Sequence, residues 1–345
     1  MSQRRVAVVG AGILGVSTAE WLRRDGHDVT LIDRNNPGEP AQTSYGNAGI
    51  LAASSFIPVP VPGLLSKIPK MLLDPMGPLH LKWSYLPRLV PWLIPFLRRA
   101  NKKDVENTAR ALATIVTDTV EQHRALAAGT GAEQYIAPGI YAFLYRSQEA
   151  CEADETGHAL RRSYGTNVEF RDRARLLQDD PALGGRYNYA ACHKDHGWIT
   201  NPAAYVAALF SHFSGQGGSF LQAEADDIEP GLDSATVRAA GTAHNFDQVV
   251  LSGGAWSGKL ARKLGHNPAL ETERGYHLLL KNPSHSAPFP YMLTDSKFVA
   301  TPMESGLRCA GQVEFGGLKA GPSRAPFLLV KTRVSQLYPD LTWDG

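Results

Sequence analysis

The sequence is short of cysteine. Its 345 residues include three, Cys151, Cys192 and Cys309, which stand far apart along the chain. That spacing provides neither a Cys-x-x-Cys metal pair nor the framework of a disulfide-rich secreted domain. We therefore expect no metal site, a reducing compartment such as the cytoplasm, and Cys309 as a buried core thiol.

The sequence also lacks an excess of charge of either sign. Lys and Arg total 35 against 33 for Asp and Glu, a formal net charge of +2. Proteins that hold nucleic acid along their surface carry a clear basic excess. No nucleic-acid partner is expected, and a small molecule is the favoured ligand.

Long hydrophobic runs are missing as well. No apolar stretch reaches the roughly 18 uninterrupted residues that a membrane-spanning helix needs. Arg4 and Arg5 precede an apolar run, as in a twin-arginine or secretory signal, but glycines interrupt that run and no convincing cleavage site follows. The composition, 43% hydrophobic and 20% charged, is globular, and the length favours two domains.

A β-α-β pattern opens the chain. The apolar run 6–9 predicts a buried strand, residues 10–15 read Gly-Ala-Gly-Ile-Leu-Gly, an amphipathic helix follows, and a second strand at 29–32 ends at Asp33. In such a unit the glycines allow a tight turn, the approach of a pyrophosphate and close helix packing, while the acid bonds a ribose hydroxyl. The pattern predicts a dinucleotide site, and Asp33 would repel the 2′-phosphate of NADP.

Further elements follow from periodicity and turn residues. The small, polar stretch 41–55 predicts a ligand-binding loop, and the prolines of 56–99 argue against any long helix there. Helices are expected at 104–128, 202–213 and 326–337, and strands at 139–145, 220–221, 225–228, 237–244, 246–250, 276–280, 298–302 and 307–315.

Four later stretches carry a resemblance to a known family. They are Thr-Ser-Tyr-Gly-Asn-Ala-Gly-Ile at 43–50, Gly-Trp-Ile-Thr-Asn-Pro at 197–202, Val-Val-Leu-Ser-Gly-Gly-Ala-Trp at 249–256, and the segment 303–317. Together with the N-terminal fingerprint they resemble the D-amino-acid oxidase superfamily, and the last resembles its D-amino-acid dehydrogenase branch. The similarity spans nearly the whole chain, so the sequence is identified as a member of that superfamily. A single Gly-x-Gly-x-x-Gly argues against the second nucleotide domain of a monooxygenase or disulfide reductase.

The resemblance implies an α/β fold, α+β overall, with a Rossmann-like FAD-binding domain and a second, mostly antiparallel substrate domain. We expect the FAD domain at 1–55 and 195–265, with 326–345 in part, and the substrate or cap domain at 56–194 and 266–325. Family members hold the adenine with backbone groups at the position of Ala225. The residues expected to bind FAD are Gly10, Ala11, Gly12, Ile13, Leu14, Gly15, Asp33, Arg34, Thr43, Ser44, Asn47, Ala48, Gly49, Ala225, Gly253, Gly254 and Trp256.

The implied reaction oxidises the Cα–N bond of a D-amino acid. The α-hydrogen leaves as hydride to the flavin N5, and the imine hydrolyses to a 2-oxo acid and ammonia. The substrate carboxylate needs a cation, which a guanidinium supplies best. Arg308 is the candidate, because related amine oxidases use an arginine in the corresponding strand; the alternative is a solvated strand arginine. Arg274 is the second candidate, with Tyr276 and His277 as pocket walls or donors, and no acid–base residue is obligatory.

Other functions stay open. The chain could be a glycine or sarcosine-type amine oxidase, or a catalytically weak flavin-binding subunit; an NAD-dependent dehydrogenase would leave the later motifs unexplained. The electron acceptor could be a quinone, an electron-transfer protein or O₂. Segment 56–99, rich in basic and apolar residues, either lies on the inner face of the cytoplasmic membrane or caps the substrate site.

Relatives in this superfamily continue past the helix near Leu337 with a segment whose backbone amides contact the flavin. The sequence stops at Gly345, where that segment should begin. We expect weak flavin retention and poor turnover from this polypeptide alone.

Overall fold

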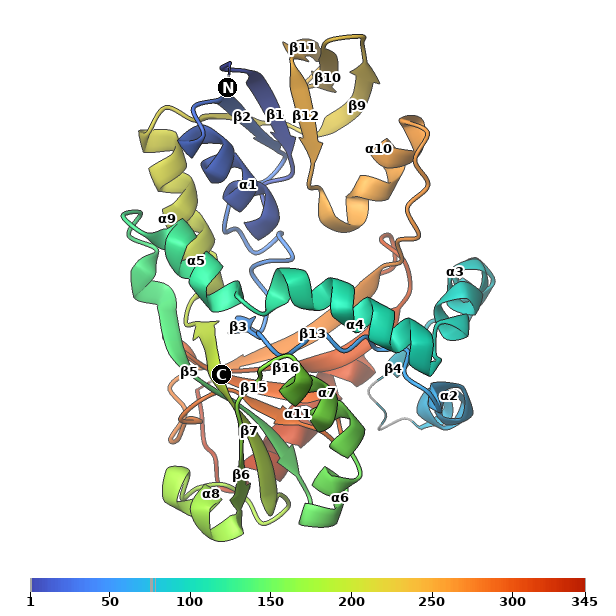
Figure 1. The fold of residues 1–345 in the computed structure, drawn as a ribbon, viewed down its shortest axis with the longest axis vertical. Helices are drawn as coiled ribbons and strands as arrows, with labels where there is room; N and C mark the ends of the chain where they lie inside the picture. The colour runs from blue at the N-terminus through green and yellow to red at the C-terminus, as the bar shows by residue number, and fades with distance from the viewer. Residues whose placement is uncertain (1, 75–76, 78, 345) are drawn as a thin grey trace. The chain divides into compact units, whose positions relative to one another are not determined.

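The computed structural model describes residues 2–74, 77 and 79–344, and Figure 1 labels its elements. The first sheet is parallel, with strand order β12-β1-β2-β8. Its strands are β1 (Arg5–Val9), β2 (Asp28–Asp33), β8 (Ser219–Gln222) and β12 (Gln248–Leu251), accompanied by helices α1 (Ile13–Arg24) and α9 (Pro202–Gly215). Val6, Val8 and Leu31 are buried, as expected for strands covered on both faces.

A small antiparallel sheet adjoins it in the order β11-β10-β9. Its strands are β9 (Ala225–Pro230), β10 (Ala235–Ala239) and β11 (Thr242–Phe246), and the short helices nearby are η3 (Gly254–Trp256) and α10 (Ser257–Lys263). Ile228, Val237 and Phe246 share one core cluster with Ala7 and Ile32 of the parallel sheet. This meander therefore packs on the dinucleotide-type unit.

The larger sheet has the order β13-β16-β15-β14-β5-β7-β3, with β4 beside β16 and β6 beside β7. Its pairings are antiparallel except β14–β5 and β16–β4. The strands are β3 (Ile50–Leu51), β4 (Leu79–Leu81), β5 (Ile136–Tyr145), β6 (Val168–Asp172), β7 (Tyr189–Ile199), β13 (Glu273–Leu280), β14 (Tyr291–Leu293), β15 (Phe298–Met303) and β16 (Gly306–Phe315). The predicted α/β class with a second, mostly antiparallel sheet is confirmed.

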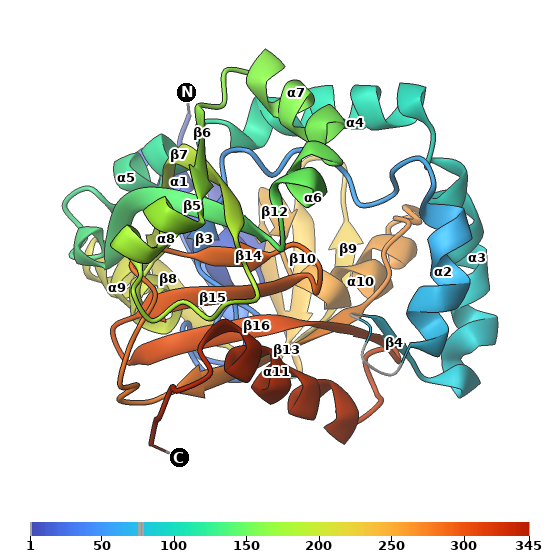
Figure 2. The ribbon, with the colours of Figure 1, turned by 90° about the horizontal axis from the view of Figure 1, so that it is seen from below.

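Helices cover both faces of this sheet (Figure 2). Helix α11 (Arg324–Leu337) packs Val330 and Val334 on one face, against Cys309 and Leu307. The short helices α6 (Gln148–Glu152) and α7 (Glu155–Ser163) lie over the other face. The remaining helical elements are α2 (Leu64–Leu73), η1 (Trp83–Tyr85), α3 (Leu86–Arg98), α4 (Lys102–Val116), α5 (Thr119–Ala127), η2 (Glu133–Tyr135) and α8 (Arg173–Asp179).

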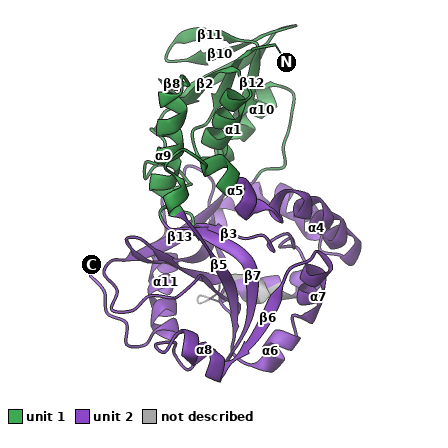
Figure 3. Ribbon diagram, turned by 60° about the vertical axis from the view of Figure 1, so that its left-hand side comes forward, with its two compact units in different colours: residues 1–47, 123–135, 201–270 green, residues 48–122, 136–200, 271–345 purple. Residues whose placement is uncertain are grey.

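The chain divides into two compact units, each made of separate stretches (Figure 3). Unit 1 comprises residues 1–47, 123–135 and 201–270, and unit 2 comprises 48–122, 136–200 and 271–345. Unit 1 contains the parallel sheet and unit 2 the larger sheet.

The expectation of no long helix within 56–99 is wrong. Helix α3 spans 13 residues and contains Pro91 and Pro95. Each proline removes one backbone hydrogen bond, but the rings stand four residues apart and so share one side of the helix. Packing compensates, since Leu89 is 2% exposed and Trp92 stacks on Phe96 at 4.7 Å. Pro75 and Pro78 lie outside the described residues.

Other differences are local. The strand expected at 237–244 is divided between β10 and β11, with a turn at Ala240 and Gly241. The single helix expected at 104–128 is divided into α4 and α5. Strand β7 was not expected, and Gly197, Trp198 and Ile199 of the family-like stretch 197–202 form its last residues. The three cysteines are unpaired and buried, which confirms Cys309 as a core thiol. Within the described part of the chain, no helix has the length and apolar character to cross a membrane.

Candidate functional site

The carboxyl ends of the parallel strands in unit 1 form one edge of the sheet. Gly10 follows β1, Asp33 ends β2 and Ser252 follows β12. Open parallel sheets bind ligands at this edge, at the point where the strand order reverses. Here the reversal lies between β12 and β1, immediately beside the glycine fingerprint.

Two of the three fingerprint glycines are required by packing within the protein. Gly10 has a φ of +111°, and a Cβ there would lie 2.5 Å from the carbonyl oxygen of Ser252. A Cβ on Gly15 would lie 1.7 Å from the carbonyl oxygen of Gly10. These contacts bring α1 against β1 and β12.

Gly12 is different, because no backbone atom crowds it. A Cβ at Gly12 would meet only the Ser44 hydroxyl, at 3.2 Å. It is the N-cap of α1, it has no side chain to cap the helix, and the first turn contains no acid. The positive end of the helix dipole is therefore accessible to a phosphate group, as a dinucleotide requires. This open cradle fits the pyrophosphate of FAD.

Asp33 holds the turn in place from the neighbouring strand. Its Oδ2 accepts a hydrogen bond from the backbone N–H of Ala11 at 2.7 Å, and its Oδ1 accepts one from Asn35 at 2.8 Å. Ser44 Oγ accepts from the Ile13 N–H at 2.9 Å, and Gln42 donates to the Ala11 carbonyl at 2.9 Å. The loop after β2 thus folds back onto the fingerprint.

The other predicted FAD residues of unit 1 surround this edge. The Arg34 guanidinium lies 5.0 Å from the centre of the Trp256 ring, and both side chains are exposed. Leu14, at the start of α1, is a large apolar side chain that is 65% exposed. Gly253, Gly254 and Ala225 lie in the segments that follow β12 and β8, and Thr43 and Asn47 lie in the loop after β2.

Ala48 and Gly49 belong to unit 2. Gly49 has a φ of +75°, and a Cβ there would lie 2.6 Å from the Ile199 carbonyl oxygen. Its own carbonyl accepts a hydrogen bond from the Ile199 N–H at 2.6 Å, at the end of β7. The structure therefore explains Gly49 by this close approach of two chain segments.

The four candidate substrate residues lie on adjacent strands of unit 2 but face in two directions. Arg308 on β16 pairs with Leu279 on β13, and His277 pairs with Ala310. Alternation along each strand places Arg308 and His277 on the same face. Tyr276 lies on the opposite face, in the core beneath α11.

Tyr276 and Arg274 meet at a buried carboxylate, which the sequence analysis did not anticipate. The Tyr276 hydroxyl donates to Glu314 at 2.5 Å, and an Arg274 nitrogen lies 3.6 Å from the same carboxyl oxygen. Burial raises the pKa of Glu314, but hydrogen bonds from Ser323 and Tyr276 outweigh it and leave the pKa lowered. Ser323 is the N-cap of α11, and its backbone N–H donates to the Tyr276 hydroxyl. Tyr276 and Glu314 therefore anchor the start of α11.

Arg308 and His277 form the other group. Arg308 is 6% exposed, which excludes the solvated strand arginine as its description. The pKa of His277 is lowered by burial and by the nearby Arg308 charge, so its imidazole is neutral at pH 7. A buried guanidinium beside a neutral imidazole is a combination of groups that can bind a carboxylate.

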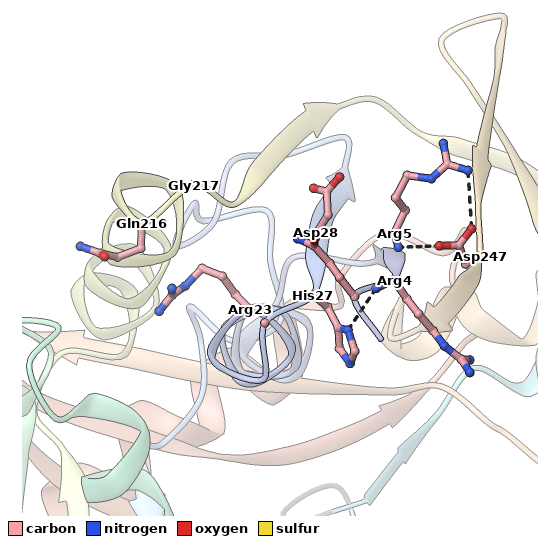
Figure 4. Close-up of a pocket in the computed structure, with 10 residues that line it drawn as sticks. Arg4, Arg5, Arg23, His27, Asp28, Gln216, Gly217 and Asp247 are labelled. Carbon is pink, nitrogen blue, oxygen red and sulfur yellow. Dashed lines mark hydrogen bonds and ion pairs between the residues drawn. The ribbon is translucent and has the colours of Figure 1, made fainter. Parts of the chain in front are cut away.

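A separate hollow of about 580 Å³ lies at the opposite edge of the parallel sheet (Figure 4). Its lining includes Arg4, Arg5, His27 and Asp247. The Arg5 N–H donates to Asp247 at 2.7 Å, and the Arg4 N–H donates to His27 at 3.3 Å. None of the predicted cofactor residues lines this hollow. Within the described residues, no group of His, Cys, Asp and Glu has the arrangement of a metal site.

The fold and the glycine cradle define a dinucleotide-binding α/β protein with a second, β-rich unit. The chain belongs to the FAD dependent oxidoreductase family, which it matches over residues 5–344. It is a flavin-dependent oxidoreductase, and the expected cofactor, FAD, is confirmed at the level of the family.

Two relatives and one solved structure illustrate the similarity. A D-amino-acid oxidase of Bradyrhizobium diazoefficiens is 35% identical over 99% of this chain and 81% of its own length. D-amino acid dehydrogenase 2 of Ralstonia nicotianae is 29% identical over 97% of this chain and 81% of its own. A glycine oxidase structure from Bacillus cereus has a TM-score of 0.68 at 15% identity, covering 99% of this chain and 81% of that one, and shows the shared fold.

Sequence reasoning missed two residues of the cradle. Ser252 donates its hydroxyl to the carbonyls of Val9 and Gly10, at 3.0 and 3.2 Å. It lies within the family-like stretch 249–256, so the motif contained the signal. Gln42 lies beside the 43–50 stretch and has no local pattern that indicates its contact with Ala11.

Proposed function

We propose that this protein oxidises a D-amino acid at its Cα–N bond, with Arg308 binding the substrate α-carboxylate. One observation carries the assignment to this site: Arg308 is a buried cation on the sheet face that α11 leaves uncovered. The similarity to a D-amino-acid oxidase over 99% of the chain supports the substrate class. FAD, when bound, supplies the hydride acceptor.

The protein's own residues have modest roles in this proposal. Arg308 orients the carboxylate, and neutral His277 offers a hydrogen bond beside it without adding a second charge. Asp33 and the N-terminus of α1 hold the ribose and the pyrophosphate. Orientation of the Cα–H bond is the main contribution expected from the chain.

The visible absorption spectrum of the purified protein, followed by anaerobic titration with D- and L-amino acids, tests this function. Because flavin retention is expected to be weak, the titration is made with FAD in excess; we expect this flavin to bleach with D-amino acids and to keep its colour with their L-enantiomers. Bleaching by glycine or sarcosine alone would favour the amine-oxidase alternative instead. Flavin that no amino acid reduces would contradict the proposal and favour a binding subunit.

The electron acceptor is a second part of the proposal. The relatives include proteins named as an oxidase and as dehydrogenases. Oxygen consumption measured against reduction of an artificial quinone or dye acceptor distinguishes O₂ from a quinone or an electron-transfer protein.

We further propose that segment 56–99 contacts an anionic membrane surface on the cytoplasmic side. Leu65, Trp83 and Ile94 are 59%, 60% and 45% exposed, and Arg88 and Arg98 are also solvent-accessible. Apolar side chains beside basic ones suit such an interface. Sedimentation with anionic vesicles, compared with neutral ones, tests it; Ile94→Glu should weaken binding, and equal recovery with both vesicle types would contradict it.

A further inference from the structure

A buried polar cluster lies on the same face of the large sheet as Arg308, toward its other end. His193 on β7 pairs with Tyr141 on β5. The next pair along these strands, Ala142 and Cys192, belongs to the core beneath α11. His193 therefore points away from α11. Arg161 of α7 reaches the same region, since its guanidinium lies 5.1 Å from the centre of the Phe143 ring and His193 lies 4.5 Å from it.

The hydrogen-bonding capacity of this cluster is incompletely used. Arg161 is 9% exposed and His193 is 0% exposed. Both ring nitrogens of His193, and Nε and Nη1 of Arg161, are buried and have no hydrogen-bond partner among the described residues. Buried polar groups normally find partners, because leaving one unpaired costs about 1–3 kcal/mol.

Some neighbouring side chains are fully paired, whereas His158, whose ring lies 6.1 Å from that of His193, also has an unpartnered Nδ1. Both ring nitrogens of His196 are used: the Nδ1–H donates to the Lys194 carbonyl at 2.8 Å, and Nε2 accepts from the Ser54 backbone N–H at 3.1 Å and from its hydroxyl at 3.0 Å. The Tyr145 hydroxyl donates to Asp154 at 2.9 Å. The His193 ring lies 5.9 Å from the His196 ring, so its unpartnered nitrogens are close to groups that are paired.

The positive charge of Arg161 also lacks a carboxylate in direct contact. A guanidinium remains protonated even when buried. No carboxylate in the described part of the chain lies within 4.0 Å of Arg161; Asp154 acts on it only from a greater distance. Burial lowers the pKa of Arg161 although the Asp154 charge raises it, so this carboxylate compensates the buried cation only in part.

We propose that Arg161 and His193 bind one small carboxylate anion. A carboxylate provides two acceptor oxygens, which can take hydrogen bonds from two side chains at once. Its single negative charge balances one guanidinium beside a neutral imidazole. Sulfate or phosphate would bring a second charge that the cluster does not match.

This site is separate from the candidate substrate site. In the strand order β16-β15-β14-β5-β7, four strand spacings lie between Arg308 and His193. At about 4.8 Å per spacing the two positions are roughly 19 Å apart. A single amino acid cannot span that distance, so the carboxylate at Arg161 belongs to a second molecule, such as a free 2-oxo acid.

Binding of acetate and of pyruvate to the apoprotein tests the proposal without any turnover. Calorimetry and thermal melting at constant ionic strength, with chloride as the reference salt, give the readouts. We expect saturable binding in the wild type and in Arg308→Met, which removes the candidate substrate anchor. Arg161→Met should weaken binding about tenfold or more, because one charge-assisted hydrogen bond is lost. Arg162→Met, an exposed neighbour on α7, is the matched control and should bind normally.

Nitrogen-15 NMR of the histidine rings provides a readout that needs no core substitution. Acetate should shift the His193 resonances in the wild-type protein. The proposal is overturned if acetate binds no better than chloride, if Arg161→Met binds as well as the wild type, or if binding disappears in Arg308→Met alone. Failure of the D-amino-acid reaction would leave these results unaffected, so the two proposals can fail separately.

Discussion

Arg308 illustrates how burial gives one arginine a specific role. Its side chain is nearly inaccessible, whereas Arg238, also on a strand, is exposed and paired with Glu229 at 2.6 Å. We expect Arg308→Met to raise the KM for a D-amino acid roughly 10- to 150-fold, because a charge-assisted hydrogen bond contributes about 1.5–3 kcal/mol. Steady-state kinetics with an artificial acceptor measure it. Arg238→Met is the control, and equal KM values in the two variants would refute a carboxylate anchor at Arg308.

Neighbouring residues 274, 276, 277 and 308 were predicted as one pocket, and the structure separates them. Strand periodicity alone implies that Tyr276 and His277 point to opposite faces. The sequence could therefore predict that they separate, but not which face holds the site. That depends on α11, whose packing against Cys309 and Leu307 is a contact between elements distant in sequence.

At the scale of elements, the junction of β1 and α1 distinguishes two functions of glycine. A Cβ at Gly15 would overlap the Gly10 carbonyl, whereas a Cβ at Gly12 meets only the Ser44 hydroxyl. We expect Gly15→Ala to destabilise the protein by about 1–3 kcal/mol or more through overpacking. Gly12→Ala should fold with near-normal stability and bind FAD weakly, since the methyl group faces the phosphate position. Urea unfolding of the apoproteins and flavin fluorescence titration measure the two effects; loss of folding in Gly12→Ala would contradict this division.

His193, on strand β7, makes the stability of the protein depend on pH. Burial, with Arg161 and the other histidines 158 and 196 nearby, lowers the pKa of His193 to about 2. The unfolded chain takes up a proton near pH 6.5 and the folded one does not, so stability falls as pH drops below about 6.5. The slope is about 1.4 kcal/mol per pH unit for one such group.

Urea midpoints between about pH 7 and pH 5, in buffers without carboxylates, measure this slope. We expect His193→Gln to lose less stability on acidification than the wild type, by about 2 kcal/mol at pH 5. His266→Gln, an exposed histidine, is the control. Identical slopes in all three proteins would show that His193 does not take part.

Helix α3 shows why local patterns fail at some elements. Proline frequency predicts no helix, and that rule neglects packing by Leu89 and the Trp92–Phe96 stack. By contrast, the β-α-β unit was predicted closely, because its strand periodicity, glycine spacing and terminal Asp33 agree with one another.

The whole molecule is assembled from distant stretches of chain. Residues 123–135 belong to the same unit as the glycine fingerprint, and α11 packs in the other unit. No periodic pattern in the sequence indicates which unit a segment belongs to, because that depends on contacts that form only after both segments have folded. Motifs therefore predicted the β-α-β unit closely and left the membership of distant segments in each unit unpredicted.

The placement of the two candidate sites in different units leads to a last prediction. The fingerprint and Asp33 lie in unit 1, and Arg308 lies in unit 2. FAD at 100 times its Kd should stabilise the wild type by about 2.7 kcal/mol. Asp33→Asn keeps one acceptor oxygen but loses one of its two backbone hydrogen bonds, to Ala11 or to Asn35. If its affinity falls tenfold, the stabilisation at the same FAD concentration decreases by about 1.3 kcal/mol.

Arg308→Met should respond to FAD as the wild type does, because its side chain belongs to the substrate face and its loss changes KM. Thermal melting of both variants with and without FAD, beside their steady-state kinetics, measures the two effects in the same samples. FAD affinity would then depend on Asp33 and substrate affinity on Arg308. If the Arg308→Met protein no longer gained stability from FAD, FAD binding and substrate binding would instead be coupled through this residue.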